Sequence, residues 1–330
     1  MEINTTEAKA GVSATGGARA KEENLFRFIE FDTAKAESTA SSGYSYWKST
    51  FKVFMQRRAT RWLLYGLIAL ILFVLVQPYL PGQKDPTEIF LDPATGRQYV
   101  NIPPNAEFWF GTNSLGQDLW ARIWYGTRTT LIIAFVSVLM STVVGITVGA
   151  LWGYIRALDR FFTEIYNVLN NIPSTVIRML ITYIMRPSLS TLIFVMCLTG
   201  WIGMAKWIRN LIIIIRDREY NLASRCLGTP THRVIVKNLL PQIISVVMLD
   251  CALSIPDVIG SEVFLTYIGL GLPLSTPSLG NLIDAGRRVM MVPSQQYQLI
   301  FPAIVVALIT VSFYALGNAF ADASDPRNHV

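Results

Sequence analysis

Long apolar runs dominate this sequence, and they restrict it to a small number of folds. Four of the six runs contain no Asp, Glu, Lys or Arg, and the other two contain only a few. An α-helix needs about 20 mostly apolar residues to cross the hydrocarbon core of a bilayer. We therefore predict an all-α membrane protein with six transmembrane helices. The runs cover residues 62–80, 129–155, 161–185, 187–205, 242–267 and 299–321.

The charges support a membrane protein and indicate its orientation. Charged residues make up 15% of the chain, against about 25% in an average soluble domain. The net charge of +6 does not indicate a nucleic-acid partner, because the basic residues flank the apolar runs. With the N-terminus inside, the inner segments hold 20 Lys and Arg residues and the outer segments hold seven. Because cytoplasmic loops are enriched in Lys and Arg, we predict a multi-pass protein of the cell membrane with both termini in the cytoplasm.

Three segments on the cytoplasmic side differ from the apolar runs. Residues 1–45 are polar and lack the apolar core of a signal peptide, so we expect a disordered cytoplasmic tail. Residues 46–61 interleave aromatic and basic side chains at helical spacing, which predicts an amphipathic helix at the lipid interface. Residues 322–330 are expected to form a short cytoplasmic tail.

Two segments on the outer side are expected to carry local helix caps. Residues 81–128 contain five prolines, so we predict an irregular extracytoplasmic loop. Asp118 is expected to cap a short helix at the end of this loop. In the last outer loop, Ser278 is expected to cap a short helix over residues 279–290.

A polar, basic stretch at residues 216–241 interrupts the apolar runs on the cytoplasmic side. Gly228 suits the position just past a helix end, where a positive φ is required. Thr229 and Pro230 predict an N-cap followed by the first position of a second helix. Pro241 marks the point where this second helix gives way to the next membrane segment. The pattern is helix, break, helix.

The sequence gives no sign of catalysis. It contains no Gly-x-x-x-x-Gly-Lys-Ser/Thr pattern, so we expect no nucleotide phosphate site on this chain. Two histidines and three scattered cysteines lack metal-ligand spacing, and we predict no catalytic residue, no metal site and no cofactor. Any energy that this chain uses must then come from a partner protein or from an ion gradient.

Apart from Glu164 near one end of its run, four charged residues lie inside apolar runs, where a charge at the bilayer centre costs about 2.5–3.5 kcal/mol. We predict that Arg178, Asp250 and Asp257 line a translocation path, and that Glu262 is structural. Arg178 and Asp257 lie at depths that differ by roughly 4–5 Å, so they are expected to form a pair or to face the same path. Packing contacts at a subunit interface are the alternative.

Four blocks of residues resemble the C-type permease subunit of oligopeptide and dipeptide ABC importers, which are binding-protein-dependent transport system inner-membrane components. The resemblance covers about residues 62–327. The blocks comprise Phe110-Gly111-Thr112 with Gly116, Asp118, Tyr125-Gly126 and Arg128; Trp201 with Ala205 and Arg209; Glu219-Tyr220 with Ala223, Arg225, Gly228 and Pro241; and Glu262 with Gly269-Leu270-Gly271, Pro277-Ser278, Pro302 and Asp325-Pro326-Arg327.

The resemblance implies a type I ABC-importer permease fold, with a transmembrane type-1 domain over residues 129–321 and a cytoplasmic coupling helix within 216–241. The expected role is the membrane subunit of an ATP-driven peptide importer in a bacterial cell membrane, surrounded by lipid. The expected partners are a second permease, two ATPase subunits and an extracytoplasmic peptide-binding lipoprotein. The implied ATPase-coupling residues are Glu219, Ala223, Ser224, Arg225 and Gly228.

One departure and two alternatives remain. Leu222-Ala223-Ser224 stands where the family's coupling signature often has Glu-Ala-Ala, although two of the three residues remain small. An ion-coupled secondary transporter would use Asp250 and Asp257 as proton or cation sites, but no convincing inverted repeat supports it. A membrane scaffold without a transport path is the weaker alternative.

Overall fold

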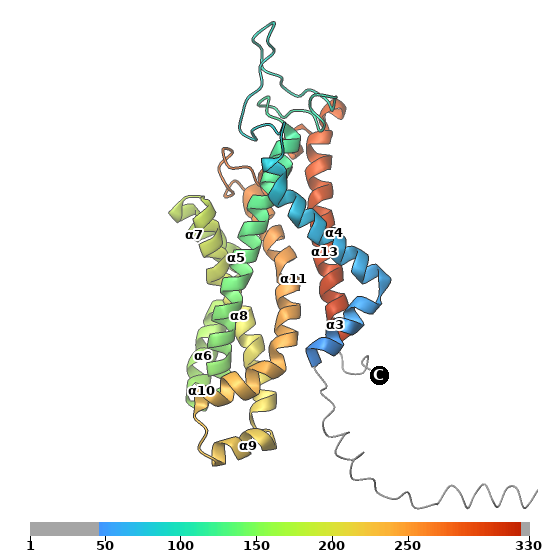
Figure 1. Cartoon of the computed structure of the whole chain (residues 1–330). Helices are drawn as coiled ribbons and strands as arrows, with labels where there is room; N and C mark the ends of the chain where they lie inside the picture. Colours follow the sequence, from blue (N-terminus) through green and yellow to red (C-terminus); the bar gives the residue numbers. More distant parts are fainter. Residues whose placement is uncertain (1–45, 325–330) are drawn as a thin grey trace, which may run out of the picture. The chain divides into compact units, whose positions relative to one another are not determined.

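The computed structural model describes residues 46–324 (Figure 1). The predicted tail at residues 1–45, the end of the tail predicted at 322–330, and the Asp325-Pro326-Arg327 block lie outside this range. The helices from Lys48 onward belong to one structural unit. The described residues form helices and two isolated β-bridges but no β-strand, so the prediction of an all-α fold is confirmed.

Five long helices are apolar enough to cross a membrane, as expected of a multi-pass membrane protein. They are α4 (Arg58–Val76), α5 (Leu119–Tyr154), α8 (Leu189–Arg216), α11 (Leu240–Tyr267) and α13 (Tyr297–Ser324). The shorter helices are α3 (Tyr46–Gln56), α6 (Arg156–Asn170), α7 (Ser174–Met185), α9 (Glu219–Cys226), α10 (Thr231–Arg233) and α12 (Leu279–Val289). Three-residue 3₁₀ turns follow α4 at Gln77–Tyr79 and precede α13 at Pro293–Gln295.

The prediction that residues 161–185 form a single transmembrane helix is wrong. It is divided into α6 and α7, with a break between Asn170 and Ser174 that contains Pro173. Proline has no amide hydrogen and disfavours helical geometry in the residue before it. α7 has 12 residues, so at about 1.5 Å per residue it is too short to cross a bilayer core of roughly 30 Å. Five of the six predicted spans are therefore single long helices and the third is a broken one.

Glycines let α5 and α8 lie close together along much of their length, with α5 crossing the length of the bundle in Figure 1. Gly145, Gly149 and Gly153 repeat at intervals of four and so share one face of α5. A Cβ atom on Gly149 would lie 2.5 Å from the carbonyl oxygen of Ala205. Small residues at this spacing are a common means of close helix packing in membranes. The α5–α8 pair therefore forms the rigid centre of the fold.

The remaining helices pack around this pair. α11 contacts α5 and α13, and α4 packs on α13. α7 packs on α8, while α12 lies against α11, α13 and α5. The apolar core of residues between α4, α5, α11 and α13 includes Leu131, Ile259 and Ile309. These contacts leave polar side chains of α5, α7, α8 and α11 facing one another, and this is where the candidate path lies.

The outer loop ends in a helix cap, but not in the short helix that we expected. Asp118 caps the long helix α5 directly, and its Oδ2 atom accepts from the amide of Ala121 at 2.9 Å. α5 therefore begins before the apolar run at 129–155. Burial raises the pKa of the Asp118 carboxyl, although the hydrogen bond from Ala121 opposes this rise. The predicted cap at Ser278 is confirmed, since its side chain accepts from the amide of Asn281 at the start of α12.

Candidate functional site

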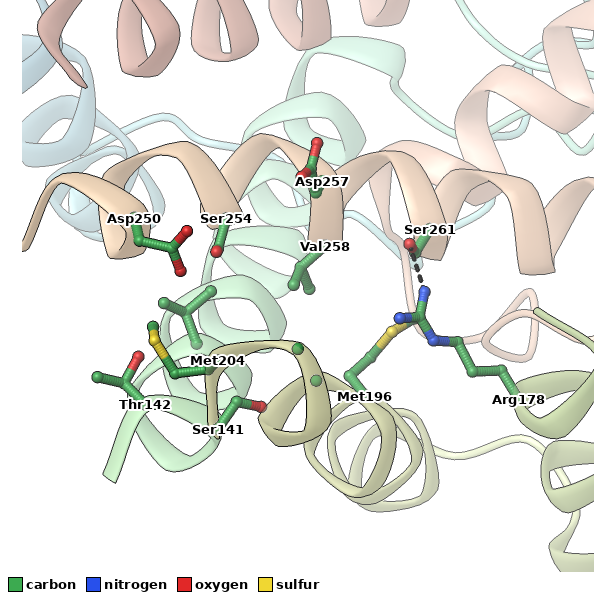
Figure 2. Close-up of a pocket in the computed structure, with 13 residues that line it drawn as sticks. Ser141, Thr142, Arg178, Met196, Met204, Asp250, Ser254, Asp257, Val258 and Ser261 are labelled. Atoms are coloured by element: carbon green, nitrogen blue, oxygen red, sulfur yellow. Dashed lines mark hydrogen bonds between the residues drawn. The ribbon is translucent and has the colours of Figure 1, made fainter. Parts of the chain in front are cut away.

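A cavity of about 280 Å³, lined by both polar and apolar side chains, lies between α5, α7, α8 and α11. Figure 2 shows its lining, with Asp250 toward one end and Arg178 toward the other. The three charged residues expected along a path all line this cavity. Its walls comprise Val138, Ser141, Thr142, Arg178, Met196, Gly200, Gly203, Met204, Asp250, Ser254, Asp257, Val258 and Ser261.

Arg178 links three helices through its guanidinium group. Its Nε atom donates to Oγ1 of Thr199 on α8 at 2.8 Å. Its Nη1 atom donates to Oγ of Ser261 on α11 at 2.7 Å. The side chain thereby holds the short helix α7 against the two long helices, and its charge is met only by neutral hydroxyl groups in these two bonds.

Asp257 lies at the boundary between this cavity and a second one of about 470 Å³. Its Oδ1 atom accepts a hydrogen bond from the hydroxyl of Tyr314 on α13 at 2.8 Å. The direct ion pair expected between Arg178 and Asp257 is not formed among the residues that the structure describes. The physical reason is that each group has a neutral partner on a different helix, Ser261 for the arginine and Tyr314 for the aspartate.

Asp250 lies in the first half of α11, one helical turn before Ser254 (Figure 2). Ser141 and Thr142 of α5 form the facing wall. Thr142 is itself in contact with Cys251, with its Oγ1 atom 3.1 Å from the sulfur. Asp250 therefore lies in a wall rich in hydroxyl groups, a polar environment within an otherwise apolar bundle.

Glu262 is structural in this fold, as expected. It is fully buried and its Oε1 atom accepts from the hydroxyl of Ser278 at 2.7 Å. Thr130 bridges the same region, since its Oγ1 atom donates to Glu262 at 3.4 Å and accepts from the amide of Leu279 at 3.1 Å. The carboxylate thus anchors the start of α12 to α5 and α11.

The expected coupling stretch forms a short exposed helix, α9, with a well-defined end. Glu219, Ala223, Arg225 and Gly228 are exposed, and Ser224 is partly buried. Gly228 has φ +76°, which confirms the predicted positive φ. The amide of Thr229 donates to the carbonyl of Ser224, and that of Gly228 to Arg225, each at 3.0 Å. These two bonds form a Schellman motif, which fixes the end of α9.

Two details of this stretch differ from the predictions. The next helix begins at Thr231, and Pro230 is its extended N-cap, so the predicted cap at Thr229 is wrong by one residue. Pro241 does not end a helix, because a π-helical turn at Val234–Leu239 leads from α10 directly into α11. A proline ring clashes with the carbonyl four residues earlier, and a wider π turn relieves that clash.

Asn221 anchors α9, and the sequence analysis missed it. The residue is fully buried, and its Nδ2 atom donates to the carbonyl of Ile215 near the end of α8 at 2.8 Å. Asn238 donates to Oδ1 of Asn221 at 3.3 Å and to Oγ of Ser224 at 3.2 Å. The only available signal was a pair of asparagines in a basic segment, which does not reveal that they meet.

A network of charged side chains holds the residues that precede α9. Asp217 is within 4 Å of the guanidinium groups of Arg216, Arg156 and Arg225, at 3.2, 3.6 and 3.7 Å. Arg216 also donates to the carbonyl of Gly153 at the end of α5, at 2.6 Å. One of the expected coupling residues, Arg225, is therefore partly held by its own chain. Within residues 46–324, no group of three His, Cys, Asp or Glu side chains is arranged to hold a metal ion.

Comparisons with known proteins identify the family that this chain resembles. Residues 141–330 match the family described as "Binding-protein-dependent transport system inner membrane component". The oligopeptide transport system permease protein AmiD of Streptococcus pneumoniae is 38% identical over 93% of this chain and 98% of its own length. The dipeptide transport system permease protein DppC of Bacillus subtilis is 31% identical over 89% of each chain. A solved structure of the MetNI methionine ABC transporter, in an inward-facing conformation, is 20% identical with a TM-score of 0.48, over 61% of this chain and 96% of that one.

The family match spans more than half of the chain, and the two permease relatives cover most of it. The ion-coupled transporter receives no support from these relatives. The family resemblance predicted from the sequence motifs is confirmed. The chain belongs to the family of binding-protein-dependent transport system inner-membrane components.

Proposed function

We propose that this chain is the membrane-spanning permease subunit of an ATP-driven importer of oligopeptides or dipeptides, and that it forms half of the translocation path. The observation that carries the proposal is the connection between the cavity and α9. α8 and α11 supply two walls of the cavity, and α9 is the exposed segment that joins them. A force on α9 would therefore be transmitted to both walls through α8 and α11, each of which is one continuous helix.

The coupling mechanism follows from how firmly α9 is held. Asn221 and the Schellman motif at Gly228 fix both the base and the end of the helix. A rigid, exposed helix of this kind suits a groove on a separate ATPase, where it would move as one body. Glu219, Ala223, Ser224, Arg225 and Gly228 are the residues we assign to that contact.

The assembly that this function requires has further members. A second, similar permease would form the other half of the path, two ATPase subunits would bind below, and an extracytoplasmic binding protein would deliver the peptide. The chain has no phosphate-loop pattern of its own, so hydrolysis belongs to the partners. Both termini would lie in the cytoplasm, because 20 Lys and Arg residues then face inward and seven face outward.

Transport in reconstituted vesicles tests this function. The chain is co-expressed with its partner subunits, purified as a complex, and placed in proteoliposomes with ATP enclosed on the ATPase side. We expect uptake of labelled peptide that requires both ATP and the binding protein, and that persists when ion gradients are dissipated. Uptake that continues without ATP but stops when the proton or sodium gradient is removed would contradict the proposal.

A further inference from the structure

The cavity in Figure 2 has unlike charges toward its two ends, and neither has an ionic partner. Arg178 donates to the hydroxyls of Thr199 and Ser261. No ion pair joins Arg178 or Asp250 to any other residue between positions 46 and 324. Asp257 supplies Arg178 with only a longer-range attraction, and charges at membrane depth without a direct ion pair are costly and generally mark a functional path. A ligand with charges of both signs would neutralise the two ends together.

The separation of the two ends can be measured along α11. Asp250 and Ser261, the partner of Arg178, lie eleven positions apart on this helix. At 1.5 Å per residue, the two levels are roughly 16 Å apart. An extended chain spans about 3.3–3.6 Å per residue, so about four or five residues match this length. The wall between the ends includes Ser254 and Gly203, and a Cβ atom on Gly203 would meet no atom within 4 Å, which leaves room for a backbone with varied side chains.

We propose that this cavity binds a peptide in one orientation, with its α-ammonium group at Asp250 and its α-carboxylate at Arg178. This inference rests on the proposed function and specifies how the cargo is held. Asp250 lies toward the cytoplasmic end of α11 in the proposed orientation, so the peptide crosses with its amino terminus leading. Recognition of the two charged termini makes no demand on the side chains between them.

Glu164 provides a control outside the cavity. Its side chain is exposed on α6, and no residue of that helix lines the cavity. Glu164→Gln removes one carboxylate charge, as Asp250→Asn does, at a place where the peptide terminus is not held.

Uptake of blocked peptides by the assembled transporter tests the proposal. The probes are labelled penta-alanine, its N-acetyl form and its C-terminal amide, each at a concentration that saturates the binding protein. We expect the wild-type transporter to import each blocked peptide about tenfold more slowly than the free one, which corresponds to 1.4 kcal/mol. Asp250→Asn should abolish the preference for a free amino terminus and keep the preference for a free carboxylate. Arg178→Gln should do the reverse, and Glu164→Gln should keep both preferences.

Several results would overturn the inference without affecting the proposed function. These are equal uptake of all three peptides by the wild type, an unchanged amino-terminal preference in Asp250→Asn, or the loss of both preferences in a single variant. Failure of the wild type to import any peptide with ATP would instead overturn the proposed function.

Crosslinking gives a second readout that does not depend on blocked peptides. Five-residue peptides carry p-benzoylphenylalanine at the first or the last position, and the crosslinks in the trapped transporter are mapped by mass spectrometry. The first position should label the wall near Thr142 and Ser254, and the last should label the wall near Thr199 and Ser261. The reverse pattern, or the same labels from both positions, would contradict a single orientation.

Discussion

The side-chain amide of Asn221 donates a 2.8 Å hydrogen bond to the carbonyl oxygen of Ile215, and this bond joins the exposed helix α9 to the end of α8. Asn221 is fully buried although most of its neighbours in α9 are exposed. Asn238 approaches the same amide from the π-helical turn that leads into α11. One side chain therefore connects α9 to α8 and α11, two of the long helices that line the cavity.

Replacing Asn221 with alanine should weaken the attachment of α9. The carbonyl of Ile215 keeps a second donor, the amide of Arg218 at 3.3 Å, so the cost is that of one lost hydrogen bond, about 0.5–1.5 kcal/mol. We expect the Asn221→Ala variant to insert normally but to retain the ATPase subunits poorly in a pull-down from detergent, with peptide uptake reduced accordingly. Asn210→Ala is the control, because Asn210 is exposed at the surface of α8. Equal recovery of the ATPases with both variants would show that the bond does not fix α9.

Gly228 should tolerate asparagine but not valine. Its φ is +76°, and a Cβ at this position would meet no atom within 4 Å, so any effect arises from the backbone and not from a clash. Non-glycine residues in the left-handed region cost about 1–3 kcal/mol, and asparagine is the best tolerated.

We therefore expect Gly228→Val to leave membrane insertion intact while it uncouples ATP hydrolysis from peptide uptake or releases the ATPases, and Gly228→Asn to remain close to wild type. Gly66→Val serves as the control, since Gly66 also has open space but an ordinary helical φ. Normal peptide uptake by Gly228→Val would show that the end of α9 needs no fixed geometry.

Much of the fold follows from the length of the apolar runs, but the break near Pro173 does not follow from apolar content alone. A proline inside an apolar run is a recognisable signal for a helix end, and the hydropathy of residues 161–185 outweighed it in our prediction. The four-residue spacing of Gly145, Gly149 and Gly153 was equally readable, since it depends only on helical periodicity. The cap at Asp118 was predicted, but the continuity of the helix that it starts with the apolar run at 129–155 was not.

The candidate site was predictable only in part. The cost of charge in a membrane is enough to single out Arg178, Asp250 and Asp257 as residues with a special environment. Their partners depend on which face of α11 meets α7 and which meets α13, and this is decided by packing between distant segments. Residues at similar depth, such as Arg178 and Asp257, need not point toward one another. Asn221 had no local signal, because its burial arises from contacts with the ends of two other helices.

A single methyl group at Gly149 should disturb the α5–α8 pair. The Cβ atom would lie 2.5 Å from the carbonyl oxygen of Ala205, closer than real contacts allow. Overpacking of this kind costs about 1–3 kcal/mol. We expect Gly149→Ala to lower the midpoint of thermal unfolding in detergent, whereas Gly66→Ala, where space is open, should not. Similar midpoints for both variants would mean that α5 and α8 are not held at this distance.

Substitutions at Asp118 should separate the contribution of its capping hydrogen bond from the contribution of its charge. Loss of an N-cap costs about 1 kcal/mol, so Asp118→Ala should destabilise the start of α5. Burial raises the pKa of Asp118, so the ionised form is disfavoured by folding and stability should decline as pH rises through this raised pKa.

Asparagine caps as well and does not ionise, so Asp118→Asn should keep wild-type stability at neutral pH and lose this pH dependence. Hydrogen exchange of the first turn of α5, followed by mass spectrometry at several pH values, measures both effects. Equal protection of the alanine and asparagine variants would exclude the cap as the cause.

Double-mutant cycles should locate the partner of Arg178. The guanidinium group donates to Ser261 at 2.7 Å, whereas the carboxylate of Asp257 accepts from Tyr314 at 2.8 Å. Residues in one hydrogen-bonded pair show interaction energies of about 0.5–3 kcal/mol, and residues without shared partners are close to additive. We expect the unfolding free energies of Arg178→Gln and Ser261→Ala to be strongly non-additive. The unfolding free energies of Asp257→Asn and Tyr314→Phe should be non-additive in the same way.

The cycle that combines Arg178→Gln with Asp257→Asn distinguishes this arrangement from a direct ion pair. Its interaction energy should be smaller than that of either hydrogen-bonded pair, because only a longer-range attraction connects the two charges. Unfolding in mixed micelles by a denaturing detergent supplies the free energies for all three cycles. A larger coupling between Arg178 and Asp257 than between Arg178 and Ser261 would show that the ion pair exists in the membrane, and that the two hydroxyl contacts are secondary to it.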